Sequence, residues 1–383
     1  MNTYINYGRQ WIDDNDIDEV VKALKSDYLT QGPAVEIFEE TICEYTGAKY
    51  CVAVSNATAG LHLAVRALGI EKDSEGITSP NTFVASSNAL IYNQLKPVFA
   101  DIDATTYNIN PCKIKEKISK KTKVIIPVHF AGRTCDMAAI RELTEENKIH
   151  SIEDAAHAIG STYENGQKVG SCVYSDMTVF SFHPVKTITT GEGGAVTTND
   201  RALYEELKML RSHGITRDTS FLTSNPGPWY YEMHELGFNY RMTDIQAALG
   251  TAQMKKLESF KARRNNIIHQ YNEAFSSLDN LQTPLADDGK NCFHLYVVKI
   301  DYDAIGMSRK KVMERLRSLS IGTQVHYIPV HTQPYYMEKF GYAYGDYPEA
   351  ENYYKAALSL PLYPAMTDDD IKRVITAIID ICN

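Results

Sequence analysis

The chain has 383 residues, a formal net charge of −9 at pH 7, 44% hydrophobic residues and 23% charged residues. These values are typical of a soluble globular protein that folds as two domains or as one large α/β unit. The negative net charge argues against nucleic acid or an anionic membrane as a general partner, and no apolar run approaches the roughly 20 residues of a membrane-spanning helix.

The N-terminal segment Met1–Tyr7 lacks a basic region followed by an apolar core, so we expect a protein that is not secreted and is cytoplasmic. Seven cysteines are scattered along the chain without a Cys-x-x-Cys pair, a pattern typical of reduced thiols in a cytoplasm. No group of His and Cys residues has the spacing of metal ligands, so we expect no metal site.

Short apolar segments alternate with helical patterns between about residues 16 and 215. Helices are expected at 16–24, from 33, at 58–68, 83–92, near 114 and at 137–147, and strands at 50–54, 98–100, 124–128, 150–154, 177–182 and 195–198. This alternation predicts a mainly parallel sheet that is covered by helices on both faces. Ligands of such sheets bind beyond the carboxyl ends of the strands.

The C-terminal part has a different pattern. A long helical tract at 243–278 leads to a strand at 294–300, a helix at 308–319, a strand at about 323–328 and closing helices. We therefore predict a large domain that includes the N-terminal segment, residues 1–250, and a smaller C-terminal α+β domain, residues 251–383.

The segment 177–195 is the most informative for function. A β-rich run brings Ser181, His183 and Lys186 into a loop that ends in Gly-Glu-Gly-Gly before the next strand. A lysine just beyond a strand end becomes nucleophilic if its pKa falls, and it can then attach to an aldehyde cofactor. Taken alone, the segment also fits a strand-loop-strand hairpin with a solvated lysine.

Three other elements each have a functional and a structural interpretation. The small-residue turn before Thr58 either binds an anion at a helix N-terminus or only caps that helix. Asp154, at the end of a buried strand, either meets a cationic group such as a protonated pyridine nitrogen or caps the next helix. Asn239, in the cluster 236–242, fits a loop before a helix cap, while Ser181 is a natural donor to a phosphate oxygen.

Together with Phe83, these elements are the parts of a pyridoxal-phosphate (PLP) site. The chain resembles the fold-type I aminotransferases of the DegT sugar-aminotransferase family over essentially its whole length. Within that family it is most similar to the UDP-4-amino-4,6-dideoxy-N-acetyl-β-L-altrosamine transaminases of pseudaminic acid synthesis. The resemblance rests on the sequences LTQGP at 29–33, EDAAH at 153–157, FSFHPVK at 180–186, GPWYYEM at 227–233, GFNYR at 237–241 and VHYIPVH at 325–331.

The resemblance implies a role for each matching residue of the cofactor site. Lys186 would hold the cofactor covalently and move a proton, and Asp154 would pair with the pyridine nitrogen. His157 would lie near the ring hydroxyl, and Phe83 would stack on the ring face. The cofactor phosphate would be bound by the backbone of Ala57, Thr58 and Ala59 together with Ser181.

The resemblance also implies a homodimer with shared active sites, because Asn239 would reach the phosphate in the neighbouring subunit. Contacts to the nucleotide sugar would come from Tyr7, Asp27, Tyr28, Leu29, Thr30, His326, Tyr327, Ile328 and Pro329. In two places the chain departs from the general family pattern. His157 replaces a common Gln, as in the similar subfamily, and Gly76 replaces an apolar strand residue, which weakens the prediction of a strand there.

The reaction implied by the resemblance takes the amino group of L-glutamate to C4 of UDP-2-acetamido-2,6-dideoxy-β-L-arabino-hexos-4-ulose. The product would be UDP-4-amino-4,6-dideoxy-N-acetyl-β-L-altrosamine. The nearest alternative is the same chemistry at C3 or C4 of another UDP- or dTDP-linked keto sugar. A PLP-dependent sugar dehydratase and a catalytically silent regulator or binding module are further alternatives, and Lys186 argues against both.

Overall fold

The computed structural model of the chain describes residues 3–285 and 289–383. Its centre is a seven-stranded sheet with the order β1-β7-β6-β5-β4-β2-β3. The strands are β1 (Tyr50–Val54), β2 (Glu75–Thr78), β3 (Lys96–Phe99), β4 (Thr122–Ile126), β5 (His150–Asp154), β6 (Met177–Ser181) and β7 (Gly194–Thr198). Neighbouring strands from β3 to β6 are parallel, and β7 runs antiparallel to β1 and β6. The predicted mainly parallel sheet is confirmed.

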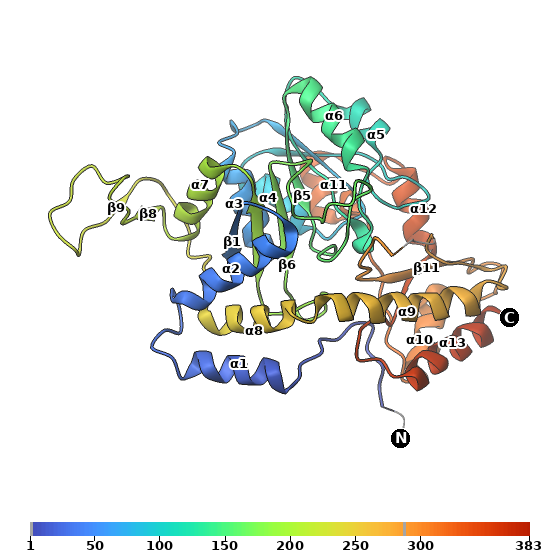
Figure 1. Cartoon of the computed structure of the whole chain (residues 1–383). Coiled ribbons are helices and arrows are strands. Elements are labelled where there is room, and N and C mark those ends of the chain that lie inside the picture. The colour runs from blue at the N-terminus through green and yellow to red at the C-terminus, as the bar shows by residue number, and fades with distance from the viewer. Residues whose placement is uncertain (1–2, 286–288) are drawn as a thin grey trace.

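Helices cover both faces of this sheet, as Figure 1 shows. Buried side chains of α2 and α6 share a core with Ala53, Ile125 and Phe180, whereas those of α3, α4 and α7 share a core with Val54, Ile126 and Val179. Adjacent residues of a strand therefore point into different cores, which explains the nearly continuous apolar strand sequences. The helices of this part are α1 (Asp14–Leu24), α2 (Pro33–Thr46), α3 (Ala57–Ala67), α4 (Ala85–Tyr92), α5 (Pro111–Lys117), α6 (Met137–Asn147), α7 (Arg201–Arg211) and α8 (Asp244–Met254).

Strand β2 forms despite Gly76, and close packing against α4 explains why a glycine stands at this position. A Cβ atom at Gly76 would lie 2.3 Å from Cδ2 of Leu90 in α4. The glycine therefore lets α4 pack closely on the sheet. This close approach matters for the site, because the first turn of α4 borders the cavity described below.

A second, three-stranded antiparallel sheet lies in the C-terminal part, with the order β10 (Leu281–Gln282), β11 (Tyr296–Ile300), β12 (Ala357–Leu360). The prediction of a strand at 323–328 is wrong. Within this range, Gln324 alone forms a β-bridge, to Ser359. Residues 324–328 instead line the cavity, and β12 supplies the third strand. The surrounding helices are α9 (Leu257–Phe275), α10 (Arg309–Ser318), α11 (Pro334–Phe340), α12 (Pro348–Ala356) and α13 (Asp368–Cys382).

The N-terminal segment crosses to this C-terminal part. Ile5 is buried in the core around the small sheet, its N–H donates to the Ser320 carbonyl at 2.9 Å, and it bridges Ile321. The predicted helical tract at 243–278 is two helices, α8 and α9, separated at Lys255 and Lys256. The division of the chain at residue 250 stays a prediction.

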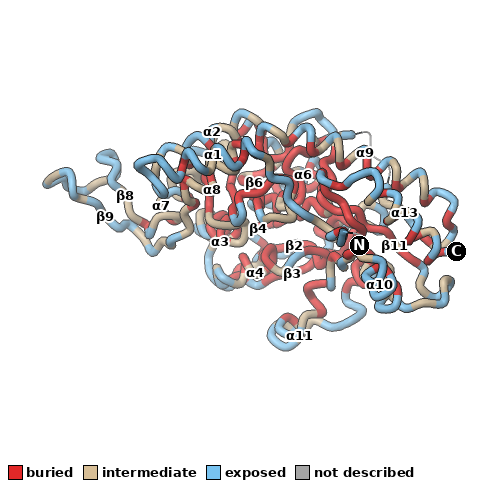
Figure 2. Tube along the Cα trace, turned by 90° about the horizontal axis from the view of Figure 1, so that it is seen from below, coloured by how far each residue is buried: buried red, intermediate tan, exposed pale blue. Residues whose placement is uncertain are grey.

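A two-stranded hairpin, β8 (Ile215–Thr216) with β9 (Glu232–Met233), stands away from the body of the molecule. Figure 2 shows the buried residues gathered along the central sheet, and this hairpin outside them. Trp229 is 70% exposed and Leu236 is 69% exposed. In the part of the chain that the structure describes, no helix is both long enough and apolar enough to cross a membrane.

Candidate active site

A cavity of about 780 Å³ lies beyond the carboxyl ends of β5 and β6, where parallel sheets bind ligands. Its wall combines the turn before α3, the first turn of α4, the loop after β6 and the segment 324–328. Most of the predicted site residues line it: Tyr7, Ala57, Thr58, Phe83, Asp154, His157, Ser181, Lys186, His326, Tyr327 and Ile328.

The N-terminus of α3 opens on this cavity. Asn56 caps the helix, and its side-chain oxygen accepts the N–H of Ala59 at 2.8 Å. The N–H groups of Ala57 and Thr58, the first two helical residues, have no intrahelical acceptor, and both residues line the cavity. The two interpretations of this turn are therefore compatible, because the cap uses Ala59 and leaves Ala57 and Thr58 for an anion. Ala59 itself is not part of the cavity wall.

Asp154 ends β5 and is only 5% exposed. Its Oδ2 accepts the Ser86 hydroxyl at 2.6 Å, and its Oδ1 accepts the N–H of Ala156 at 3.1 Å. The side chain does not cap a following helix, because the chain continues into turns. The carboxylate is thus fixed at the cavity wall.

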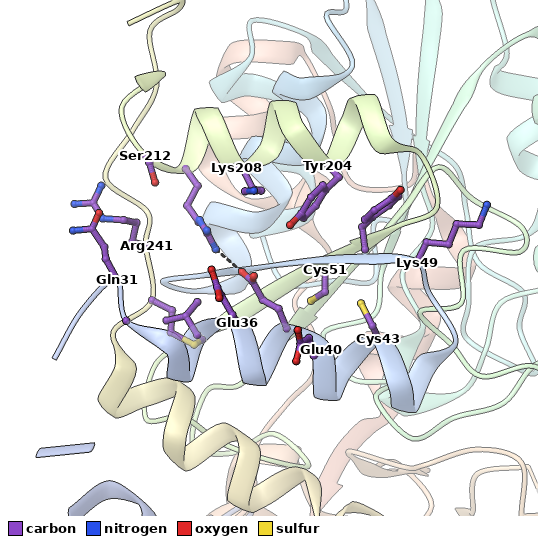
Figure 3. Close-up of a pocket in the computed structure, with 16 residues that line it drawn as sticks. Gln31, Glu36, Glu40, Cys43, Lys49, Cys51, Tyr204, Lys208, Ser212 and Arg241 are labelled. Carbon is purple, nitrogen blue, oxygen red and sulfur yellow. Dashed lines mark hydrogen bonds and ion pairs between the residues drawn. The ribbon is translucent and has the colours of Figure 1, made fainter. Parts of the chain in front are cut away.

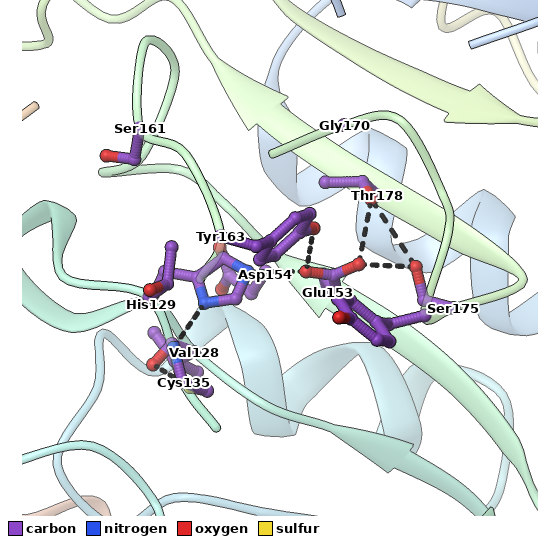
Figure 4. A network of polar contacts seen from close by, with 12 residues as sticks. Val128, His129, Cys135, Glu153, Asp154, Ser161, Tyr163, Gly170, Ser175 and Thr178 are labelled. Atoms are coloured by element: carbon purple, nitrogen blue, oxygen red, sulfur yellow. Dashed lines mark hydrogen bonds and ion pairs between the residues drawn. The ribbon is translucent and has the colours of Figure 1, made fainter. Parts of the chain in front are cut away.

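Glu153, the preceding residue, points to the other side of β5 into a network of polar contacts (Figure 4). Its carboxylate is fully buried and accepts hydrogen bonds from His129 at 2.6 Å, Tyr163 at 2.5 Å and Ser175 at 2.5 Å. Burial acts to raise the pKa of Glu153, but these hydrogen bonds, that of His129 foremost, outweigh burial and lower the pKa. The network fixes β5 directly beneath Asp154.

Lys186 lies in the loop after β6, where a turn joins its N–H to the carbonyl of His183 at 2.8 Å. Burial lowers the pKa of Lys186 to about 8, although the charge of Asp154 acts in the opposite direction. About a tenth of this amine is therefore neutral, and nucleophilic, at pH 7, a far larger share than for an ordinary lysine. Ser181, at the end of β6, is buried in the same wall.

His157 and Tyr327 meet across the cavity wall, with 3.0 Å between Nε2 of the histidine and the tyrosine hydroxyl. The backbone N–H of Ala131 donates to Nδ1 of His157 at 3.3 Å. Burial and the neighbouring Lys186 lower the pKa of His157 well below its usual value, so the ring is neutral and this pattern places its proton on Nε2. The tyrosine hydroxyl accepts a hydrogen bond from this Nε2–H group and can donate its own hydrogen to another acceptor.

Several predicted residues lie outside this cavity. Asn239 is exposed and forms a β-bridge with Ser212. The backbone carbonyl of the next residue, Tyr240, accepts the N–H of Ser55 at 2.8 Å, beside the turn before α3. Six further predicted residues lie outside the cavity wall: Ala59, Asp27, Tyr28, Leu29, Thr30 and Pro329. Residues 27–30 are all exposed within the single chain.

Sequence reasoning missed other parts of the wall. His183, Glu192, His294 and Gln324 line the cavity, and Ser86 holds Asp154 from behind. Of these, His183 and Glu192 are part of the segment 177–195, whose motif was the available signal. Ser86 and His294 carry no local signal, because their place depends on contacts with distant segments.

A second cavity of about 430 Å³ lies between α2 and α7 and is of a different kind. Figure 3 shows Glu36 and Glu40 of α2 facing Tyr204 and Lys208 of α7. An ion pair of 2.6 Å joins Glu39 to Arg211 inside it. None of the predicted site residues lines this cavity, and its charged groups are mixed in sign.

The mainly parallel sheet, the strand-end lysine with its lowered pKa and the fixed aspartate opposite define the class of enzymes that bind an aldehyde cofactor through lysine. The profile of the DegT/DnrJ/EryC1/StrS aminotransferase family matches residues 10–379. The chain belongs to this family. This agrees with the resemblance found in the sequence.

Two relatives match nearly the whole chain. An uncharacterized protein of Methanocaldococcus jannaschii, MJ1066, is 46% identical over 371 residues, 97% of this chain and 95% of its own. The spore coat polysaccharide biosynthesis protein SpsC of Bacillus subtilis is 43% identical over 382 residues, 99% of this chain and 97% of its own.

Solved structures agree with the fold and the cofactor. PseC of Helicobacter pylori, an aminotransferase involved in the biosynthesis of pseudoaminic acid, superposes with a TM-score of 0.92 at 32% identity and covers 99% of both chains. The sugar aminotransferase Spr1654 of Streptococcus pneumoniae, in its PLP form, superposes with a TM-score of 0.89 at 29% identity over 99% of this chain and 100% of its own. The fold-type I architecture is confirmed, and the chain is a PLP-dependent sugar aminotransferase.

The residues present fit this cofactor. Lys186 has an amine with a lowered pKa that could attach the aldehyde, Asp154 has a carboxylate that could meet the pyridine nitrogen, and Phe83, 59% exposed at the cavity, has an aromatic face that could stack on the ring. The first N–H groups of α3 and the Ser181 hydroxyl provide donors for a phosphate.

Proposed function

We propose that the enzyme transfers the amino group of L-glutamate to C4 of UDP-2-acetamido-2,6-dideoxy-β-L-arabino-hexos-4-ulose, giving UDP-4-amino-4,6-dideoxy-N-acetyl-β-L-altrosamine for pseudaminic acid biosynthesis. The similarity to PseC over 99% of both chains supports this substrate. The observation that carries the chemistry is the presence of Lys186 and Asp154 in the wall of one large cavity.

Each residue of the cavity has a task in this proposal. When bound, PLP supplies an electron sink for cleavage of the Cα–H bond of the amino donor. Lys186 holds the cofactor and carries the proton between the reacting carbon atoms. Asp154 keeps a proton on the pyridine nitrogen. His157, neutral and in contact with Tyr327, lies near the hydroxyl of the cofactor ring.

The nucleotide sugar would bind in the same cavity. Its proposed contacts Tyr7, His326, Tyr327 and Ile328 line the cavity wall. His326 is held by a contact of 2.7 Å between its Nδ1 and the Ser359 hydroxyl, and burial lowers its pKa to about 3, so its ring is neutral. Pro329 and the exposed segment 27–30 complete the proposed substrate contacts.

We further propose a homodimer in which Asn239 reaches the cofactor phosphate of the partner subunit. Among the described residues of the cavity wall, Lys186 is the single Lys or Arg side chain. A cofactor phosphate, a nucleotide diphosphate and a dicarboxylic amino acid require more cationic or N–H donors than this wall provides. A second subunit would supply them. The free cysteines fit the reducing cytoplasm that we propose as the location.

A second candidate is the same reaction on another keto nucleotide sugar, UDP- or dTDP-linked, at C3 or C4. The 43% identity to SpsC, a protein of spore coat polysaccharide biosynthesis, favours it. Both candidates use the same cofactor chemistry and differ only in the sugar and its nucleotide.

The test is a panel of 3-keto and 4-keto nucleotide sugars with L-glutamate and other amino donors. The product is identified by NMR. The first proposal requires 4-amination of the UDP-L-arabino substrate with the highest kcat/KM of the panel, whereas a higher value for another sugar supports the second. A deoxygenated product without nitrogen would identify a dehydratase. If the amino donor kept its amino group with every sugar of the panel, the protein would be catalytically silent.

A further inference from the structure

The carboxylate of Asp154 is held by a residue that lies 68 positions earlier in the chain. Ser86 is fully buried in the first turn of α4, and its hydroxyl donates to Oδ2 of Asp154 at 2.6 Å. An ionised carboxylate only accepts hydrogen bonds, so the direction of this contact is fixed. A hydrogen bond to a charged oxygen is shorter and stronger than a neutral one.

A second hydroxyl, that of Thr82 in the cavity wall, contacts the first. Oγ1 of Thr82 is 2.8 Å from Oγ of Ser86. Because the Ser86 hydrogen points to Asp154, the Thr82 hydroxyl is the donor in this contact, and the two hydroxyl groups form a chain directed at the carboxylate. Such chains polarise each donor in turn and strengthen the last hydrogen bond.

Helix α4 is fixed in place against the sheet. Gly76 permits the close approach of Leu90, and the hydroxyl of Ser87 lies 2.7 Å from that of Tyr336 on α11. The same turn of the chain carries Phe83 at the cavity. The position of α4 therefore sets both the aromatic wall and the donor to Asp154.

We propose that Ser86 is a positioning residue for the amino-transfer reaction: its hydroxyl orients the Asp154 carboxylate and stabilises its charge, so that Asp154 holds the proton on the pyridine nitrogen. This inference rests on the proposed role of Asp154. Oδ2 accepts from Ser86 and Oδ1 from Ala156. Each oxygen has a further lone pair, so the carboxylate is oriented from behind and remains able to accept from the ring.

Ser87 provides a matched control. It is the next residue of α4, it is also fully buried, and its hydroxyl contacts the Val84 carbonyl and Tyr336 rather than Asp154. Ser86→Ala and Ser87→Ala delete the same atom at the same depth. A general packing effect would act on both variants, whereas an effect on Asp154 would act on the first alone.

The experiment uses the PLP-loaded enzyme. It records the visible absorbance of the bound cofactor as a function of pH, and the single-turnover rate with saturating L-glutamate. Ser86→Ala is expected to shift the pH at which the band changes and to slow the turnover by about 10- to 100-fold, the range for a hydrogen bond to a charged group. Thr82→Val should give a smaller change in the same direction, and Ser86→Thr, which keeps the hydroxyl, should restore most of the rate.

The variant Asp154→Asn separates the proposed role of Ser86 from the proposed role of Asp154. If Asp154→Asn slows the enzyme and Ser86→Ala adds nothing in that background, both roles are supported. If Asp154→Asn is slow but Ser86→Ala equals wild type or Ser87→Ala, the role of Ser86 is overturned and the proposed function stands. If Asp154→Asn itself leaves band and rate unchanged, the role of Asp154 fails first.

Discussion

The inner and outer walls of the cavity differ in how they are built. On the inner wall, Asp154 is buried and held by Ser86, and the buried Glu153 behind it is held by His129. On the outer side, Phe83 at the cavity is 59% exposed, and Tyr28 and Leu29, outside the cavity wall, are 55% and 49% exposed. One chain therefore preorganises Asp154, while the exposed side chains mark the side on which the proposed partner subunit would complete the site.

The largest expected effect comes from the centre of the inner wall. Lys186→Ala removes both the covalent anchor and the proton carrier, so turnover should fall by more than the ~10²–10⁴-fold supplied by general acid–base catalysis alone. The measurement is kcat, together with reduction of the wild-type enzyme by borohydride and peptide mapping. Cofactor found on any other lysine would contradict the assignment.

The network below Asp154 should be a large contributor to stability. Glu153→Gln leaves only one oxygen for the donors His129, Tyr163 and Ser175, and should lower the free energy of unfolding by about 2–4 kcal/mol. Thermal unfolding measures the change. Glu351→Gln, which alters a second His–Glu pair with 3.0 Å between His331 and Glu351, should cost less because its side chain is 11% exposed, against 0% for Glu153. Equal losses would show that the inner wall is not unusually stabilised.

The outer wall can be tested by mixing two inactive variants. If Asn239 acts in the partner's site, a mixed dimer of Lys186→Ala and Asn239→Ala chains has both lesions in one site and leaves the other intact. At equal amounts, with random subunit exchange, activity should return to about a quarter of the wild-type value, since half the dimers are mixed.

The control for this experiment pairs Lys186→Ala with Asp154→Asn, two lesions of the inner wall. No activity should return, because each site of that mixed dimer contains one lesion. A fully active monomer in light scattering would count against the shared site, as would failure of the Asn239 mixture despite proven exchange.

The smallest effect is a shift along the pH axis. The pKa of Lys186 is lowered from 10.5 to about 8 by burial, so its amine is charged below that pH and neutral above it. The rate of covalent PLP attachment to the apoprotein should rise with pH and level off above about 8. Asp154→Asn removes the charge that raises this pKa and should move the plateau to lower pH. A rate that still climbs toward pH 10 would show an unperturbed amine.

Local sequence signals predicted the elements of the inner wall well. The helix at Met137–Asn147 and the strand at His150–Asp154 have the predicted bounds. The capping residue Asp136 directly precedes the helix, so its start is encoded locally. The third strand of the small sheet, Ala357–Leu360, was missed because it directly follows α12 without a turn residue. The tract 243–278 contains no proline at the break between its two helices, so no breaker marked it.

The candidate site was predictable to a similar degree. Lys186, Ser181 and Asp154 stand at strand ends, so the topology brings them to one edge of the sheet. The contact of Ser86 with Asp154 depends on the packing of α4 against the sheet at β2 and β3, which no local pattern contains. The places of Asp27–Thr30 and Asn239 came from the resemblance alone, since their proposed partners lie outside one chain.

The crossing of the N-terminal segment has a consequence for the order in which the enzyme is assembled during translation. Ile5 and Tyr7 are synthesised long before their partners, because the Ile5 N–H donates to the Ser320 carbonyl and the Tyr7 carbonyl accepts the N–H of Leu362. The central sheet, at residues 50–198, is made between these two segments. The wall that Tyr7 contributes to the cavity therefore closes only after Leu362 has been made, so a nascent chain whose central sheet has already folded still has an open active site.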